Sequence, residues 1–339
     1  MFLHHKKYIL NYIKDSRCNN FSLGGLMGKM KKILNILAIS ISLSFSYDKL
    51  QDGTVSTNAD GAYNSEKNLV IQFTEQYAPA YTQMLLSSYS SPNEWTSYVN
   101  GVLTPKNFNA NDKNDIIDEF GTIIHESIHH KNSIHGIYID AEHYIEYTDA
   151  EKIDTRSFFN SELIAVVLPA DAKEKIFRFT TYLEKGTDVG ANVDGISGLM
   201  NEYSAYQNGC SAALMAYDNA LKEKDTTLAI KFFKSALANY FAYYEFNSFI
   251  GAYLKYSKSK EPVIYQKIMK QNNLRMAYTL NTIQFEKVIV TINSQSSRLK
   301  SNYKLIKSSL EYYKKNYEDY AKSCMDSFQP ELTSFKLQL

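Results

Sequence analysis

Cysteine is scarce in this sequence, with only Cys18, Cys210 and Cys324 among 339 residues. Such sparse use fits a reducing or an oxidising compartment, so cysteine content alone does not indicate where the protein works. Cys18 lies ahead of a predicted signal peptide and would be lost with it. Cys210 and Cys324 could form one disulfide only if the fold placed them close enough, and we expect two buried free thiols.

Helix-breaking residues are scarce toward the C-terminus. After Gly209 the only glycine is Gly251, and the only prolines are Pro262 and Pro330. Apolar and aromatic residues recur at helical spacing from 199 to 221 and from 226 to 256, and further helices are expected over 263–293 and 297–327. The part 199–339 is therefore predicted to be helical, after a glycine-containing loop at 187–198.

Neither sign of charge is in excess. The sequence has 37 basic and 36 acidic side chains and a formal charge of +1. This balance gives no electrostatic basis for binding nucleic acid, so no nucleic-acid partner is expected. Hydrophobic residues make up 44% of the chain and aromatic residues 14%. Such a chain can bury a core and is not of the disordered class.

The apolar stretch at 33–43 is too short for a membrane span of about 20 residues. It follows a short basic segment at 30–32 and precedes small residues up to Ser46, as in a secretory signal peptide. We interpret residues 1–46 as a misannotated N-terminal extension plus signal peptide, with translation starting at Met27 or Met30. The protein is expected to be exported, to the periplasm, the cell envelope or the medium. An uncleaved signal anchor is the alternative and would be its only membrane association.

The part 47–198 is predicted to mix helices with some strand. The expected elements are a polar lead-in at 47–67, a strand at 69–73, a helix at about 75–90, a loop at 104–112, a helix from Asn111 or Asp112 to Lys131 or Asn132, and a strand pair within 134–148. With the helical part 199–339, the predicted fold class is mainly α with a small β portion, α+β.

Five of the seven histidines lie between residues 125 and 143, and the run from His125 to His129 is an HExxH motif. On a helix, His125 and His129 project from the same face about one turn apart. Two imidazoles placed in this way can bind one Zn²⁺, and Glu126 can reach a zinc-bound water as its general base. The spacing of isoleucine and phenylalanine from Ile116 to Ile128 predicts the amphipathic helix that this chemistry needs.

A catalytic zinc needs a third protein ligand, and two residues are candidates. Glu202 stands near the start of a predicted helix, where the helix dipole favours a carboxylate. His135 would extend the motif to a pattern similar to that of the metzincins, with Asn132 in place of the usual glycine and Met200 as the candidate for their methionine turn. We favour Glu202, because the metzincin glycine is missing.

Residues 122–130 and 196–206 resemble the two ligand-bearing helices of the gluzincins, the thermolysin-like zinc peptidases. The resemblance rests on the HExxH run and on Asn201-Glu202, which small and aromatic residues follow. It implies a zincin-like arrangement, with a mixed N-terminal half carrying the HExxH helix and a helical half packed behind it. It also implies hydrolysis of peptide bonds in a peptide or protein substrate. The alternatives are the metzincin-like peptidase and a non-catalytic envelope or binding protein with a degenerate motif.

Other polar residues are candidates for supporting roles. Tyr206 lies one turn beyond Glu202 and is the expected donor to the oxyanion of the reaction. His130 and His143 are alternatives for that role. The residues considered for orienting a ligand histidine are Asp154, Glu162 and Asp194.

Overall fold

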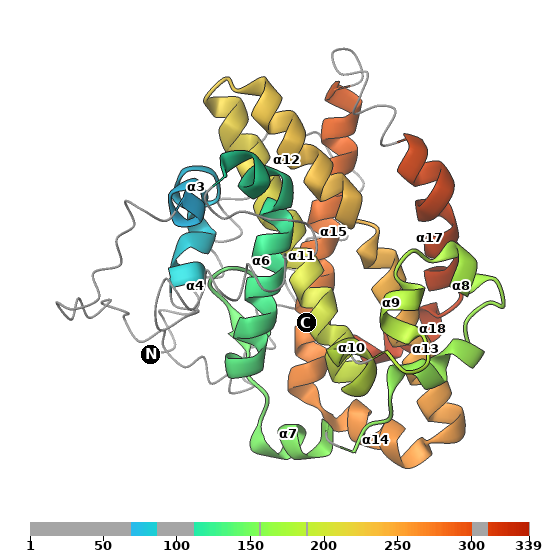
Figure 1. Ribbon diagram of the computed structural model, residues 1–339. Helices are drawn as coiled ribbons and strands as arrows, with labels where there is room; N and C mark the ends of the chain where they lie inside the picture. The colour runs from blue at the N-terminus through green and yellow to red at the C-terminus, as the bar shows by residue number, and fades with distance from the viewer. Residues whose placement is uncertain (1–68, 87–111, 156, 188, 300–310, 339) are drawn as a thin grey trace. The chain divides into compact units, whose positions relative to one another are not determined.

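The computed structural model describes residues 69–86, 112–155, 157–187, 189–299 and 311–338. The described elements belong to one compact unit within residues 49–337. The predicted extension and signal peptide, the lead-in at 47–67 and the loop residues 104–111 lie outside the described residues. The described part is predominantly helical, which confirms the mainly α prediction (Figure 1).

Most of the described residues belong to helices or to two short strands. In chain order they are α3 (Leu69–Tyr77), η1 (Pro79–Tyr81), α4 (Thr82–Leu86), α6 (Lys113–His135), β1 (Ile137–Tyr138), β2 (Tyr144–Ile145), α7 (Asp149–Thr155), η3 (Ser161–Val166), α8 (Ala172–Lys175), α9 (Phe179–Leu183), α10 (Gly190–Val193), α11 (Gly195–Lys222), α12 (Thr226–Asn239), α13 (Ala242–Lys260), α14 (Pro262–Lys270), α15 (Asn272–Leu299), η4 (Lys314–Glu318), α17 (Asp319–Asp326) and α18 (Gln329–Phe335).

Helix α6 begins where its sequence predicts. The Asp112 side chain accepts a hydrogen bond from the Asn114 backbone N–H at 2.8 Å, which caps the helix. The predicted apolar stripe from Ile116 to Ile128 is buried. The expected stop at Lys131 or Asn132 is wrong, because α6 continues to His135. Both residues at the expected stop are buried, so tertiary contacts sustain the last turn despite its polar sequence.

The alternating segment after α6 forms a small antiparallel pair. β1 and β2 are two residues each, with Ile137 opposite Ile145 and Tyr138 opposite Tyr144. The expected strand structure at 134–148 is therefore present but short. It is the only sheet among the described residues.

Two expectations for local structure are wrong. Residues 69–73 belong to helix α3 rather than to a strand, and their run of apolar residues continues at helical spacing to buried Tyr77. A short apolar run does not by itself distinguish a strand from a helix. The expected loop at 187–198 contains α10 and the start of α11. Its glycine at 198 allows close packing, because an added Cβ would lie 2.0 Å from the Gly190 carbonyl oxygen.

The C-terminal helices largely follow the predicted pattern. α12 and α13 divide the stripe at 226–256, and α14 and α15 cover the predicted helix at 263–293. The helix expected at 297–327 is present in the described residues as the end of α15 and as a helical stretch from 311 to 326 that includes the π segment η4 and α17. Cys210 and Cys324 are both free and buried, as expected. None of the helices in the described ranges is both long and apolar enough to cross a membrane.

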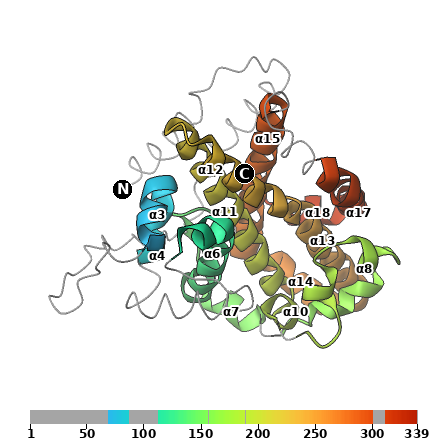
Figure 2. The same ribbon diagram turned by 45° about the horizontal axis from the view of Figure 1, so that its top comes forward.

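Helix α11 is the central element of the fold. It packs against α6, α12, α13 and α15, and buried residues occur on all its faces. Both ribbon views show α6 alongside α11 (Figure 1, Figure 2). The two helices approach closely at Gly121 and Gly209, where an added Cβ on Gly209 would lie 2.7 Å from the Gly121 carbonyl oxygen and 3.5 Å from the His125 Cβ. This crossing brings the HExxH face against α11.

We expect Gly209→Ala to destabilise the protein. Alanine is the better helix former by about 1 kcal/mol, but a methyl group against the α6 backbone costs about 1–3 kcal/mol of packing, so a net loss is expected. Urea unfolding at equilibrium measures the change. Gly190→Ala is the matched control, since its added Cβ meets only Asp194 Oδ2 at 3.5 Å. Wild-type stability in Gly209→Ala would contradict the proposed close contact.

Candidate metal centre

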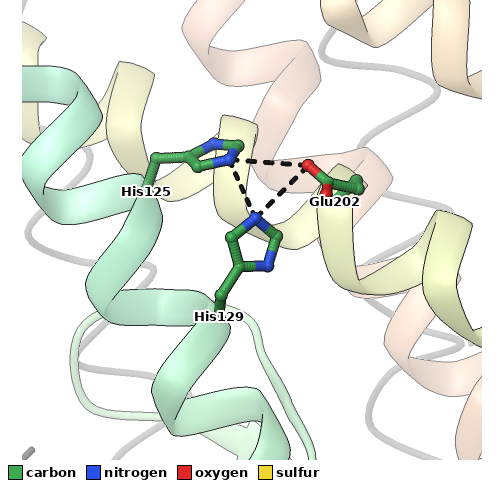
Figure 3. Close-up of side chains that lie close together, drawn as sticks. All are labelled: His125, His129 and Glu202. Atoms are coloured by element: carbon green, nitrogen blue, oxygen red, sulfur yellow. Dashed lines mark hydrogen bonds and ion pairs between the residues drawn. The ribbon is translucent and has the colours of Figure 1, made fainter. Parts of the chain in front are cut away.

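Three side chains from two helices meet at the crossing of α6 and α11 (Figure 3). The Nε2 atoms of His125 and His129 lie 2.9 Å apart. Glu202 Oε2 lies 3.5 Å from the first and 3.3 Å from the second. Among the described residues, this is the group of histidine and acidic side chains whose donor atoms could hold one metal ion.

The dimensions of this triangle fit a tetrahedral metal ion. With bonds of about 2.0–2.1 Å, as zinc makes to nitrogen and oxygen, two ligand atoms lie about 3.3 Å apart. The three observed separations are 2.9, 3.3 and 3.5 Å. Glu202 Oε2 is buried and has no hydrogen-bond donor among the described residues. A buried carboxylate oxygen beside two ring nitrogens is suited to a cation.

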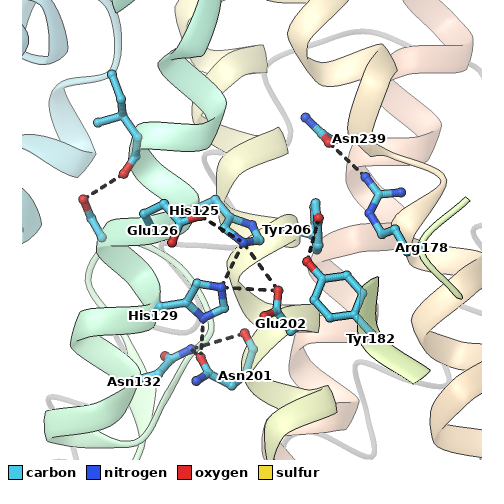
Figure 4. A network of polar contacts seen from close by, with 12 residues as sticks. His125, Glu126, His129, Asn132, Arg178, Tyr182, Asn201, Glu202, Tyr206 and Asn239 are labelled. Carbon is cyan, nitrogen blue, oxygen red and sulfur yellow. Dashed lines mark hydrogen bonds and ion pairs between the residues drawn. The ribbon is translucent and has the colours of Figure 1, made fainter. Parts of the chain in front are cut away.

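A chain of hydrogen bonds determines which nitrogen of His129 faces the triangle (Figure 4). Asn132 Oδ1 accepts from the Tyr138 backbone N–H at 2.8 Å, so its Nδ2 donates to Asn201 Oδ1 at 2.6 Å. The same Asn201 oxygen lies 3.0 Å from His129 Nδ1. Since a carbonyl oxygen only accepts, Nδ1 must carry the proton. In the neutral imidazole, the form that binds a metal, the lone pair is then on Nε2 and points toward His125 and Glu202.

His125 is oriented by packing. Its Nδ1 atom is buried and has no hydrogen-bond partner in the described part of the chain. The Tyr206 ring lies against the imidazole, with centroids 4.3 Å apart at 66°. On the other side of that tyrosine, the guanidinium carbon of Arg178 lies 4.2 Å from the ring centroid. The Tyr182 and Tyr206 hydroxyls are 3.0 Å apart.

Arg178 is in turn held by the helical layer behind the site. Its guanidinium donates to Glu245 Oε2 at 2.7 Å and to Asn239 Oδ1 at 2.9 Å. The side chains of Arg178 and Glu245 are only 3% and 1% exposed. Residues of α12 and α13 are thus connected through Arg178 and Tyr206 to a histidine of α6.

The ionisable groups of the triangle perturb one another strongly. Burial lowers the pKa of His125, and the neighbouring His129 lowers it further. Burial also acts to lower the pKa of His129, but the Glu202 carboxylate outweighs it and raises this pKa to about 9. Burial acts to raise the pKa of Glu202, yet the two imidazoles hold it well below its usual range. The electrostatics of the triangle therefore favour a positive charge among the three groups.

The sequence-predicted residues separate into two groups. Glu126 lies beside the triangle, with Oε1 4.0 Å from His125 Nε2 and its side chain 22% exposed. His135 lies at the end of α6 with its ring 5.3 Å from that of Tyr144, and it does not join the triangle. His143 pairs with Asp140 at 2.8 Å.

None of the acids considered for orienting a ligand histidine bonds to one. Asp154 pairs with Lys267 at 3.2 Å, and Glu162 accepts from the Gly186 backbone N–H at 3.0 Å. Asp194 instead lines a separate pocket. The orienting group is the amide of Asn201, which the sequence offered only as the residue preceding Glu202. Asn132 and Arg178 were also missed as supporting residues, and only their close approach in space reveals them.

Comparison of the chain with protein-family models, curated proteins and solved structures found no match. The function of the site is therefore inferred from its own residues and geometry.

We expect Glu245→Gln to destabilise the fold strongly. It removes the counter-ion of a buried guanidinium, which costs about 3–5 kcal/mol of unfolding free energy. Urea unfolding of the purified variant measures this loss. Glu184→Gln is the control, because Glu184 pairs with Lys173 at the surface and such pairs contribute about 0–1 kcal/mol. Similar losses in the two variants would contradict a special role for the buried pair.

Proposed function

We propose that the protein is a zinc-dependent metallopeptidase, with His125, His129 and Glu202 as metal ligands. The observation that carries this proposal is the triangle of donor atoms, whose edges match those of a tetrahedral zinc site. The tautomer of His129 supports it, because Asn201 directs the Nε2 lone pair into the triangle. Glu126 supports a catalytic rather than a purely structural site, since it lies beside the ligands and remains partly exposed.

Each residue would have a defined part in peptide hydrolysis. Bound zinc would lower the pKa of a coordinated water and polarise the substrate carbonyl. Glu126 would accept the proton from that water and pass it to the leaving amine. Tyr206 is the proposed donor to the oxyanion, and the hydroxyl of Tyr182, 3.0 Å from its own, is placed to orient it.

The fold is proposed to be zincin-like in its finer arrangement. The part 47–198 would carry the HExxH helix, and the part 199–339 would supply Glu202 from α11. The position of His135 favours this gluzincin-type ligand set over the metzincin-like alternative. Export after removal of residues 1–46, to the periplasm, cell envelope or medium, belongs to the same proposal, with peptides or proteins as substrates.

Zinc content tests the ligand set. We expect about one zinc ion per chain in the purified protein and a large loss in Glu202→Gln, because a neutral amide is a poor zinc ligand. Elemental analysis after dialysis gives the ratio. His135→Gln is the matched control and should keep its zinc. Zinc lost from His135→Gln but kept by Glu202→Gln would instead support the metzincin-like set.

Glu126→Gln tests whether the metal site is catalytic. The variant should keep its zinc, while kcat/KM on a quenched fluorescent peptide library falls by about 10²–10⁴-fold, the usual contribution of a general base. Glu119→Gln, two turns earlier on α6, should retain activity. Wild-type hydrolysis by Glu126→Gln would refute the peptidase mechanism, and zinc binding with no hydrolysis by the wild type would leave a non-catalytic zinc protein.

A further inference from the structure

Arg178 is a buried cation close to the metal centre, and the proposed reaction gives it no part. It stands at the N-cap of helix α9, and its side chain is only 3% exposed. Glu245 accepts from its guanidinium at 2.7 Å and from its backbone N–H at 3.4 Å, while Asn239 Oδ1 accepts from Nη2 at 2.9 Å. One carboxylate therefore holds both the backbone and the side chain of Arg178, which leaves the guanidinium little freedom to turn.

The guanidinium of Arg178 lies over the ring of Tyr206. Its carbon is 4.2 Å from the centre of that ring, closer than to the rings of Phe241 at 4.7 Å and Phe177 at 5.5 Å. A guanidinium over an aromatic face is attracted by the ring quadrupole, and the attraction increases when the charge is withdrawn from water. Arg178 therefore restrains the position of the Tyr206 ring.

The helix that begins after Arg178 contacts Tyr206 a second time. The Tyr182 backbone N–H donates to the Arg178 carbonyl at 3.2 Å, so the two residues are one helical turn apart. The Tyr182 hydroxyl lies 3.0 Å from the Tyr206 hydroxyl. Tyr206 is thus contacted at its ring by Arg178 and at its hydroxyl by Tyr182 (Figure 4).

The ring of Tyr206 connects this restraint to a proposed metal ligand. Its centroid lies 4.3 Å from that of the His125 imidazole, and His125 Nδ1 has no hydrogen-bond partner among the described residues. A metal-binding histidine is usually oriented by a hydrogen bond from its second ring nitrogen. At His125 the contact with Tyr206 takes the place of that hydrogen bond.

We infer that Arg178 is a positioning residue of the metal centre, which acts through the ring of Tyr206 on the ligand His125. This role rests on the proposed function, which supplies the metal ligands, and it adds a residue from outside the two ligand-bearing helices. Stability alone gives no reason for the buried pair of Arg178 with Glu245, because such a pair is often no more stabilising than apolar side chains of similar volume.

The double variant Arg178→Met, Glu245→Met tests the inference. It removes both charges and replaces them with apolar side chains, so no buried charge is left unpaired and the fold should be kept. We expect its zinc affinity, measured by competition with a chelator, to be about 10–100-fold weaker, the usual effect of removing a group that orients a ligand. The visible absorption spectrum of the Co²⁺-substituted protein should also change, since it reports the geometry of the ligands. A purely structural pair would alter neither measurement.

Variants of Tyr206 test whether Arg178 acts through this ring. Tyr206→Phe keeps the ring, so adding the double substitution to it should still weaken zinc binding. Tyr206→Leu lacks the ring, so the double substitution should cause no further loss in that background. Equal further losses in the two backgrounds would contradict the proposed route.

A matched control removes a different ion pair of the same region. Lys173 and Glu184 pair at the surface at 2.6 Å, and replacing both with methionine should leave the zinc affinity at its wild-type value. Urea unfolding checks that each variant is folded. If the double variant does not fold, Arg178→Lys takes its place. Lysine keeps a positive charge for Glu245 but has no planar group to lie over Tyr206, so the same weakening of zinc binding is expected.

Wild-type zinc affinity and an unchanged Co²⁺ spectrum in the folded double variant, or in Arg178→Lys, would overturn the inference and leave the proposed function intact. A wild type that binds zinc without hydrolysing peptides would defeat the proposed peptidase, but the role of Arg178 could still be measured because every readout concerns the metal. A wild type that binds no metal would refute the ligand set and the positioning role together.

Discussion

The backbone N–H of Tyr138 can only donate a hydrogen bond, and the tautomer of His129 in the triangle depends on that fact. It fixes the amide of Asn132, which fixes the amide of Asn201, which in turn places the proton of His129 on Nδ1. In each of these hydrogen bonds only one of the two groups can be the donor. The short strand pair therefore matters for the site. It holds the Tyr138 N–H, the first donor in the series of hydrogen bonds that ends at His129, a proposed zinc ligand.

The second histidine is controlled in a different way. No hydrogen bond at Nδ1 orients the His125 ring. The ring of Tyr206 packs against it instead, and Arg178 lies over the Tyr206 ring. Aromatic packing restricts a ring with less directional precision than a hydrogen bond does. The buried pair of Arg178 with Glu245 fixes the guanidinium that lies over the Tyr206 ring. The two histidines of one motif therefore depend on different parts of the fold, His129 on the strand pair and His125 on Arg178 and its partners in α12 and α13.

Local periodicity was enough to predict much of the fold and part of the site. The isoleucine spacing predicted α6, and the helical i, i+4 spacing predicted that His125 and His129 share a face. Glu202 was proposed from the resemblance of its surrounding segment to gluzincins. The partners Asn132, Asn201 and Arg178 could not be predicted, because their roles arise from the register between helices far apart in the chain. The strand expected at 69–73 failed for a related reason, since burial on several sides makes strand and helix look alike in a short apolar run.

The ligands of the triangle are far apart along the chain, with 72 residues between His129 and Glu202. A cation held by both would close that segment into a loop and act as a reversible cross-link between α6 and α11. By the entropy argument used for disulfides, closing a loop of this length restricts the unfolded chain by about 4 kcal/mol. The enclosed segment contains the strand pair, α7, η3 and α8 to α10, which are all short elements. The same ion would thus hold together a part of the molecule that is built from short elements.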